Sequence, residues 1–304
     1  MKRIIMYHYI RNYSKELPFF NFLHKNDFYK QINFFDKKKL FNLKDNFKSF
    51  TKSNKNTLLS FDDGIYDHYS VFKRLTKLKI KGIFFIPSYP LIKKDFLKVH
   101  KIHLILGKYK SNEVIERLKK FGVKINFKKI SSKEKSYQVK SAKNVEQRNK
   151  ILIKIFLNFN LKKNNNLIDK LFNQSFSKKN QKRIFKSFYL NKSQIKEMSN
   201  HGMIIGGHSY SHKLLGSLNY KEQKFEIEKN IFHLSKLINK KINFFAYPYG
   251  GKNSFNKNTI KILRDNKVDF FFDTGNQHIN YLPKYKSIFR LNCNKFKFGK
   301  IYKY

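Results

Sequence analysis

Two hydrophobic periods alternate along the chain and predict strands and helices that follow one another. Short runs of apolar, β-branched and aromatic residues predict strands over residues 4–9, 57–64, 80–86, 203–206, 242–247, 268–273 and 288–292. Apolar positions three or four residues apart predict helices over residues 67–79, 193–200, 220–237 and 259–265, and Phe28, Ile32 and Phe35 share this spacing. Strands that alternate with helices indicate an α/β fold.

The alternation of strands and helices is interrupted between about residues 93 and 190. Helical spacing predicts helices over residues 111–121, 144–159 and 167–176, and a run of Lys and Asn at residues 162–166 predicts a loop. We interpret residues 93–190 as a helical insertion within one domain of residues 1–304, where it caps a site or shapes a substrate groove. His100 and His103 lie at its start, where a solvated helix face and a substrate contact both remain open.

Two adjacent carboxylates, Asp62 and Asp63, end the predicted strand over residues 57–64. Like charges held this close repel one another, so such a pair usually shares a proton or a cation, and a metal ion is the simplest solution. A solvated Asp-Asp-Gly turn is the alternative interpretation.

Two histidines, His208 and His212, follow the predicted strand over residues 203–206. On a helical turn, a separation of four residues places both imidazoles on one face, which suits a single divalent ion. With a carboxylate from Asp62 or Asp63 they would form a site of two histidines and one aspartate that keeps a position open for water. A pair of surface histidines at a helix start is the alternative.

Three stretches of the chain together resemble the polysaccharide deacetylases with the NodB homology domain, carbohydrate esterase family 4. Residues 60–64 (Ser-Phe-Asp-Asp-Gly) resemble the first motif of this family and residues 208–212 (His-Ser-Tyr-Ser-His) the second. Residues 245–250 (Phe-Ala-Tyr-Pro-Tyr-Gly) lie where the third motif falls. The resemblance implies a distorted (β/α) barrel of the NodB deacetylase type. The opening Met-Tyr-His of residues 6–8 is similar to a branch of the family in which the motif order is circularly permuted.

The same resemblance implies a metal-dependent hydrolysis of acetylated sugars. Asp63, His208 and His212 would bind a divalent metal, with Zn2+ as the first choice and Co2+, Ni2+ or Mn2+ as alternatives. Asp62 would be the general base that takes a proton from the attacking water. His8 would be the general acid that protonates the leaving amine, and a core histidine at the end of a strand is its alternative.

Residues 247–249 (Tyr-Pro-Tyr) would contact the substrate in the same mechanism. The backbone N–H of Tyr249 would stabilise the oxyanion, and its ring would wall the acetyl pocket unless it is simply packed at the end of a strand. Tyr247 and Pro248 would line the substrate beside it.

The chain departs from the family pattern at Ala246, where many members carry an arginine that orients the catalytic aspartate. The Phe-Ala-Tyr-Pro form does occur in the permuted branch. Asp273 and Arg290 are therefore the candidates for orienting Asp62, although an ordinary salt bridge at a strand end would explain either of them. The chain has no Leu-x-His near its C-terminus, which leaves His8 as the candidate acid.

The net charge of +46 comes from lysines spread through almost every segment. This charge either serves a function or reflects a general bias of the chain toward lysine. No spacing typical of nucleic-acid recognition is present, and we expect no specific nucleic-acid partner. Each Lys or Arg near an acidic leaflet contributes about 1 kcal/mol, which makes loose association with an anionic membrane surface a further expectation. Cys293 is the single cysteine, so no internal disulfide can form, and we expect a small buried side chain.

The apolar run at the start of the chain breaks at Tyr7 and His8, too early for the core of a signal peptide. We therefore expect a cytoplasmic protein, in part at the inner membrane face, that deacetylates a polysaccharide, a lipid-linked glycan or a sugar nucleotide. An O-acetyl esterase and a catalytically silent glycan-binding relative are the alternatives within the family. A peripheral membrane or nucleic-acid-binding protein is the alternative outside it.

Overall fold

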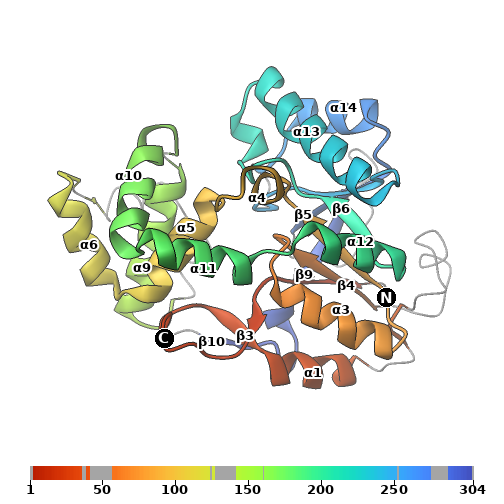
Figure 1. The fold of residues 1–304 in the computed structure, drawn as a ribbon, viewed down its shortest axis with the longest axis horizontal. Coiled ribbons are helices and arrows are strands. Elements are labelled where there is room, and N and C mark those ends of the chain that lie inside the picture. The colour runs from red at the N-terminus through yellow and green to blue at the C-terminus, as the bar shows by residue number, and fades with distance from the viewer. Residues whose placement is uncertain are drawn as a thin grey trace. The chain divides into compact units, whose positions relative to one another are not determined.

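Seven parallel strands form a closed barrel in this chain (Figure 1). The computed structural model describes residues 3–35, 39–41, 57–123, 125–126, 142–159, 161–251, 253–274 and 287–302. Around the barrel the strand order is β1 (Arg3–Tyr7), β4 (Thr57–Asp62), β5 (Gly82–Ile86), β6 (Ile204–Gly207), β7 (Phe244–Ala246), β8 (Phe270–Thr274) and β9 (Ser287–Asn292). Each strand coincides with a predicted one to within a few residues, and the predicted barrel is confirmed.

The barrel closes between the first and the last of its strands. β1 pairs with β4, where Ile5 lies opposite Leu59, and on its other edge β1 pairs with β9, where Ile5 lies opposite Leu291. Because every pair is parallel, the carboxyl ends of all seven strands meet at one end of the barrel.

Alternate residues of each strand face the barrel interior and the surrounding helices. The interior cluster consists largely of bulky apolar side chains, which are Ile4, Leu58, Ile83, Phe85, Phe244, Phe272 and Ile288. Residues of the opposite parity, such as Leu59 and Phe61, belong to the outer core. The described interior of the barrel is therefore a packed core, and polar side chains that follow the interior parity emerge at its ends.

Amphipathic helices cover the outside of the barrel. They are α1 (Lys25–Phe34), α3 (Asp67–Lys77), α12 (Lys192–Asn200), α13 (Tyr220–Ile238) and α14 (Lys257–Asp265), and the short helix α4 (Tyr89–Lys93) follows β5. Val71 and Leu75 lie on the buried face of α3, in agreement with the predicted amphipathic helix. Ile227 and Leu234 of α13 are also buried. The remaining short elements are β2 (Ile10–Arg11), β3 (Phe22–His24), η2 (Leu215–Ser217), η3 (Cys293–Lys295) and β10 (Ile301–Tyr302).

The chain forms two compact units. The first contains residues 1–11, 23–95 and 187–300, which include the barrel, and the second contains residues 12–22, 96–186 and 301–304. The second unit is built from α5 (Lys98–Lys108), α6 (Ser111–Lys120), α9 (Val145–Phe159), α10 (Leu161–Ser175) and most of α11 (Lys178–Phe188). The assignment of residues 1–304 to one domain with an insertion at about 93–190 stays a prediction.

The predicted loop over residues 162–166 is wrong, because this run lies inside α10. Lys is a good helix former and Asn is only mildly unfavourable in a helix, and the burial of Ile168, Leu171 and Phe172 stabilises the segment as a helix. His100 in α5 is fully buried and His103 is half-buried, so the solvated face is wrong for His100.

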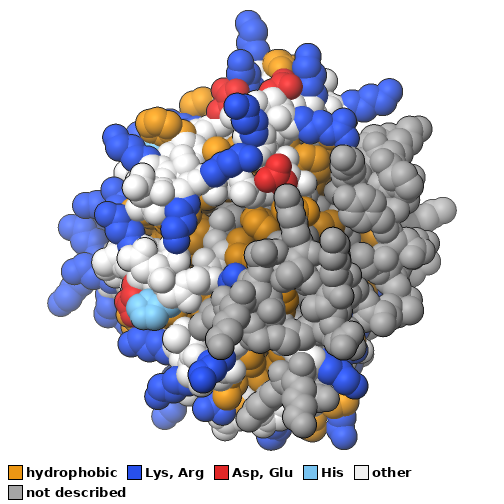
Figure 2. All heavy atoms as spheres, turned by 90° about the vertical axis from the view of Figure 1, so that its right-hand side faces the viewer, with side chains coloured by type: hydrophobic (Ala, Val, Ile, Leu, Met, Phe, Trp, Pro, Cys, Tyr) orange, Lys and Arg blue, Asp and Glu red, His pale blue; other side chains and the backbone are white. Residues whose placement is uncertain are grey.

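Lysine and arginine side chains project from much of the described part of the face in Figure 2, with few acidic side chains among them. Within the described part of the chain, no helix is both long enough and apolar enough to cross a membrane. Cys293 is buried, as expected.

Candidate active site

Asp62 is the last residue of β4 and forms a bidentate ion pair with Arg290 of β9. Arg290 Nη1 lies 2.5 Å from Asp62 Oδ1, and Nη2 lies 2.8 Å from Oδ2. Both side chains are almost completely buried, and the guanidinium also lies over the Phe85 ring, 4.9 Å from its centre. Burial works to raise the pKa of Asp62, but Arg290, followed by His208 and His8, outweighs it and holds this pKa below its usual range. Asp62 is therefore an oriented, ionised carboxylate.

Asp63, His208 and His212 converge on one point and are all buried. Asp63 Oδ1 lies 3.5 Å from His208 Nε2 and 3.2 Å from His212 Nε2, and one ligand atom from each of the three residues lies within 4.8 Å of the others. The donor set of one carboxylate and two imidazoles is the one that catalytic zinc sites use.

The tautomer of His208 suits a metal ligand. Its Nδ1 lies 2.8 Å from the carbonyl oxygen of Ala246, which can only accept a hydrogen bond, so Nδ1 is the donor and Nε2 is the nitrogen that faces Asp63. Burial lowers the pKa of His212 against the opposing effect of Asp63, which favours the neutral imidazole that a metal requires. The residues present therefore fit a divalent ion.

The two histidines do not share a face of a helical turn, so the predicted reason for their convergence is wrong. Residues 208–212 form a loop in which Ser209 and His212 have positive φ values of 57° and 60°. Asp63 and Tyr249 also have positive φ, at 81° and 67°. Non-glycine residues in this region are uncommon, and their concentration in the motif loops indicates that the loops are held in unusual conformations by their surroundings.

Helix α13 holds the loop of the second motif at two points on its buried face. Asn230 accepts a hydrogen bond from the backbone N–H of His208 at 3.0 Å and donates one to the carbonyl of Ile86 at 3.0 Å. One turn earlier, Glu226 accepts hydrogen bonds from the backbone N–H and the hydroxyl of Ser211, at 2.7 and 2.5 Å. The ion pair of Glu226 with Lys213, at 3.5 Å, lies just beyond the loop. Both ends of the loop are thus fixed to one helix.

His8 directly follows β1 and is half-buried. His68 of α3 holds its backbone, because His68 Nε2 lies 2.9 Å from the carbonyl oxygen of His8. Asp67 fixes the next residues by accepting hydrogen bonds from the backbone of Ile10 and from the Arg11 guanidinium at 2.8–3.1 Å. Burial lowers the pKa of His8, and the charges of Asp63 and Asp62 are close enough to oppose this effect. His8 therefore lies within electrostatic reach of the Asp pair.

The other predicted site residues are divided between the site and the outer core. The ring of Tyr249 lies 5.0 Å from that of His212, and Tyr249 is 38% exposed. Pro248 is buried. Tyr247 is fully buried in the outer core, where its ring stacks on Phe255 with 4.1 Å between the ring centres.

Asp273 of β8 has the outward parity and accepts a hydrogen bond from the hydroxyl of Ser287 at 3.0 Å. It makes no hydrogen bond to Asp62 within the described part of the chain. Of the two orienting candidates, Arg290 contacts Asp62 and Asp273 does not.

Sequence reasoning missed Glu226, Asn230 and His68. A signal for two of them was present, since Glu226 and Asn230 are polar residues at positions of α13 that share the buried face of Ile227 and Leu234. Polar residues on a buried helix face need partners, and such partners are often functional loops. His68 gave no comparable signal.

The fold and the site together define a class of parallel barrel in which a buried Asp/His/His cluster that could hold a metal lies beside a second aspartate. The sequence model of the polysaccharide deacetylase family matches residues 110–271, more than half of the chain, and the chain therefore belongs to this family of carbohydrate deacetylases. The match includes His208, His212 and the third motif but not residues 60–64. No curated protein has a significant sequence match to the chain.

Solved structures of deacetylases have the same fold. A deacetylase of Streptococcus pyogenes in complex with acetate, PplD, superposes with a TM-score of 0.56 at 16% identity, over 96% of this chain and 91% of that one. IcaB of Ammonifex degensii gives 0.53 at 15% identity, over 95% and 90%. A de-N-acetylase of Aggregatibacter actinomycetemcomitans gives 0.53 at 13% identity, over 95% and 94%.

Proposed function

We propose that this chain is a metal-dependent hydrolase that removes the acetyl group from an N-acetylated sugar in a polysaccharide, a lipid-linked glycan or a sugar nucleotide. The observation that carries the proposal is the buried cluster of Asp63, His208 and His212 next to the ion pair of Asp62 with Arg290. Membership of the deacetylase family supports the reaction, and the donor set supports the metal.

Asp63, His208 and His212 would hold the ion through one carboxylate oxygen and two imidazole nitrogens. Zn2+ is our first choice, and Co2+, Ni2+ and Mn2+ are the alternatives. When bound, such an ion polarises a carbonyl and lowers the pKa of a water molecule.

Asp62 acts as the general base in this proposal. Its pKa lies below the usual range, so it is ionised at neutral pH and can accept a proton from the water that attacks the acetyl carbon. Arg290 occupies both carboxylate oxygens and so fixes the plane of the carboxylate. We assign Arg290 as a positioning residue for Asp62.

His8 delivers a proton to the departing amine in this proposal. Its backbone is held by His68, and its side chain lies within electrostatic reach of Asp62 and Asp63. The backbone N–H of Tyr249 is the proposed donor to the oxyanion, and the Tyr249 ring walls the acetyl pocket beside His212.

The experiment that tests the proposal is a measurement of acetate release by the purified protein, loaded with Zn2+, from N- and O-acetylated sugars, sugar nucleotides and glycolipids. The variants are Asp62→Asn and, as a matched control, Asp269→Asn, which changes an aspartate that is half-exposed in the same unit. We expect release from an N-acetylated substrate by the wild type and the control but not by Asp62→Asn. Release only from O-acetylated substrates would assign an esterase, and no release despite a bound metal would assign a glycan-binding protein.

The place of action also stays a proposal. Cytoplasmic location, in part at the inner membrane face, is supported by the composition of the chain, with its net charge of +46. Fractionation of cells that express the full chain tests the proposed location. Recovery of the protein on the outer side of the cytoplasmic membrane or in the medium would contradict it.

A further inference from the structure

Helix α13 has a second, outward face with a different composition. Five side chains three or four residues apart form one row along it, which we call the Lys–Phe stripe: Lys221, Phe225, Lys229, Phe232 and Lys236. Lys229 is half-buried and the other four are exposed. The stripe lies opposite the face that carries Glu226 and Asn230, and it extends over about 22 Å of helix.

Two aromatic rings of the stripe are unusually exposed for their size. Phe225 is 51% exposed and Phe232 is 59% exposed, and they are two turns apart on one side of the helix. Lys229 Nζ lies 4.6 Å from the centre of the Phe225 ring, and Lys236 Nζ lies 6.0 Å from that of Phe232. Each ring is therefore accompanied by an ammonium group.

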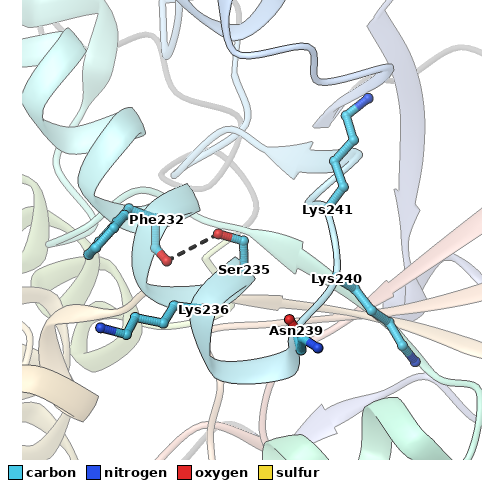
Figure 3. Close-up of a pocket in the computed structure, with 6 residues that line it drawn as sticks. All are labelled: Phe232, Ser235, Lys236, Asn239, Lys240 and Lys241. Atoms are coloured by element: carbon cyan, nitrogen blue, oxygen red, sulfur yellow. Dashed lines mark hydrogen bonds between the residues drawn. The ribbon is translucent and has the colours of Figure 1, made fainter.

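The described part of the chain supplies no acidic partner for the lysines of the stripe. Among the described residues, no carboxylate lies within ion-pair distance of Lys221, Lys229 or Lys236, and Glu228 on the flank pairs instead with Lys224 at 3.9 Å. At the C-terminal end of α13 a shallow hollow continues the basic surface, lined by Phe232, Ser235, Lys236, Asn239, Lys240 and Lys241 (Figure 3). Phe232 and Lys236 extend from the same side of the helix there.

We propose that the Lys–Phe stripe docks α13 on the surface of an anionic lipid bilayer. Helices that bind in the plane of a membrane combine lysines for the anionic headgroups with large apolar side chains that enter the headgroup boundary. A nucleic acid duplex would engage the three lysines and leave both Phe rings in water, whereas a bilayer accommodates both groups. This inference does not depend on the deacetylase reaction.

The test is cosedimentation of the full chain with vesicles of phosphatidylcholine alone and of phosphatidylcholine with phosphatidylglycerol. The stripe variant changes Lys221, Lys229 and Lys236 to Gln. The matched control changes three exposed lysines in and after α3, Lys73, Lys77 and Lys79, to Gln, and so removes the same charge. We expect the stripe variant to bind anionic vesicles about a hundredfold more weakly than the wild type, and the control to stay within about threefold.

A second variant tests the rings at constant charge. At raised salt the charge attraction is screened, and the vesicle binding that remains depends on the apolar rings. The double variant Phe225→Gln with Phe232→Gln should lose this salt-resistant binding. The control Phe34→Gln, which changes a similarly exposed Phe of α1, should retain it. Circular dichroism of every variant controls for folding. Equal losses in the two lysine variants would overturn the proposal, as would the absence of binding to anionic vesicles. Binding to duplex DNA through the stripe without binding to vesicles would replace it by a nucleic-acid surface.

Discussion

Arg290 and Asp62 form a buried bidentate ion pair between the last strand of the barrel and the strand that carries the first motif. The two residues are 228 positions apart in sequence, yet their strands lie on either side of β1 and their side chains meet in the barrel interior. In the proposed mechanism, Arg290 takes the orienting role of the arginine that the resemblance to the family leads one to expect at the position of Ala246.

The first prediction concerns this pair. Arg290→Met leaves a buried carboxylate without its partner, and we expect a loss of about 3–5 kcal/mol in the free energy of unfolding, measured in urea. The double variant with Asp62→Asn should recover much of this stability but no deacetylase activity. Arg264→Met, at an exposed position of α14, is the control. A loss below about 1 kcal/mol in the single variant would mean that the folded chain does not depend on this ion pair for its stability.

Metal binding gives the second prediction. A divalent ion that binds only the folded chain stabilises it by about 2.7 kcal/mol at a free concentration of a hundred times Kd. We expect Zn2+ to raise the melting temperature of the wild type and of His201→Ala, whose imidazole is exposed, but not of His212→Ala. Equal stabilisation of all three proteins would show that the ion binds elsewhere.

The third prediction tests the hold of α13 on the second motif. Glu226→Gln weakens the hydrogen bonds to Ser211, and we expect Zn2+ affinity to fall about tenfold, since partners that orient ligands contribute to affinity. Glu228→Gln changes the same residue type two positions away, where the side chain is partly exposed, and should leave the affinity unchanged. Isothermal titration with Zn2+ measures both, and an affinity unchanged in Glu226→Gln would remove Glu226 from the site.

The fourth prediction is a pH dependence of stability. Burial raises the pKa of Asp273 to about 6, so the folded chain retains a proton that the unfolded chain has released. Stability contributed by this residue is therefore fully present below the unfolded pKa and falls as the pH rises to about 6, by about 2–3 kcal/mol. Asp273→Asn should be more stable than the wild type above this range and lose the dependence. Urea midpoints from pH 4 to 8 measure the effect, and parallel pH profiles of the two proteins would contradict it.

The sequence was sufficient for the strands of the barrel and for the residues of the cluster. Short apolar runs separated by helices clearly predict strands of a parallel sheet. The carboxyl ends of parallel strands meet at one end of a barrel, so Asp63 and His208, which follow two such strands, are expected to lie close together. The conformation of the second motif was not predictable from spacing, because its positive φ values depend on contacts with Glu226 and Asn230 that are distant in sequence.

The sequence analysis left open whether Asp273 or Arg290 orients Asp62, although the alternation of side chains along the strands distinguishes them. Side chains alternate along a strand, and Ile288 and Arg290 share one face of β9, while Asp273 lies on the opposite face from the interior residue Phe272. Only an interior residue can reach Asp62, which shares its parity with Leu58. Once the barrel is assumed, strand register therefore favours Arg290 as the partner of Asp62.

The closure of the barrel by β9 also has a consequence for how the chain folds during synthesis. At about 5–20 residues per second, roughly 11–45 s separate the emergence of Asp62 from that of Arg290. During this interval the strand edges that pair with β9 are unpaired. Burial of the Asp62 carboxylate is then unfavourable, because the Arg290 guanidinium has not yet been synthesised. A nascent chain that lacks β9 should therefore remain expanded around its first motif and depend on chaperones, and the reaction centre should form in the last folding step.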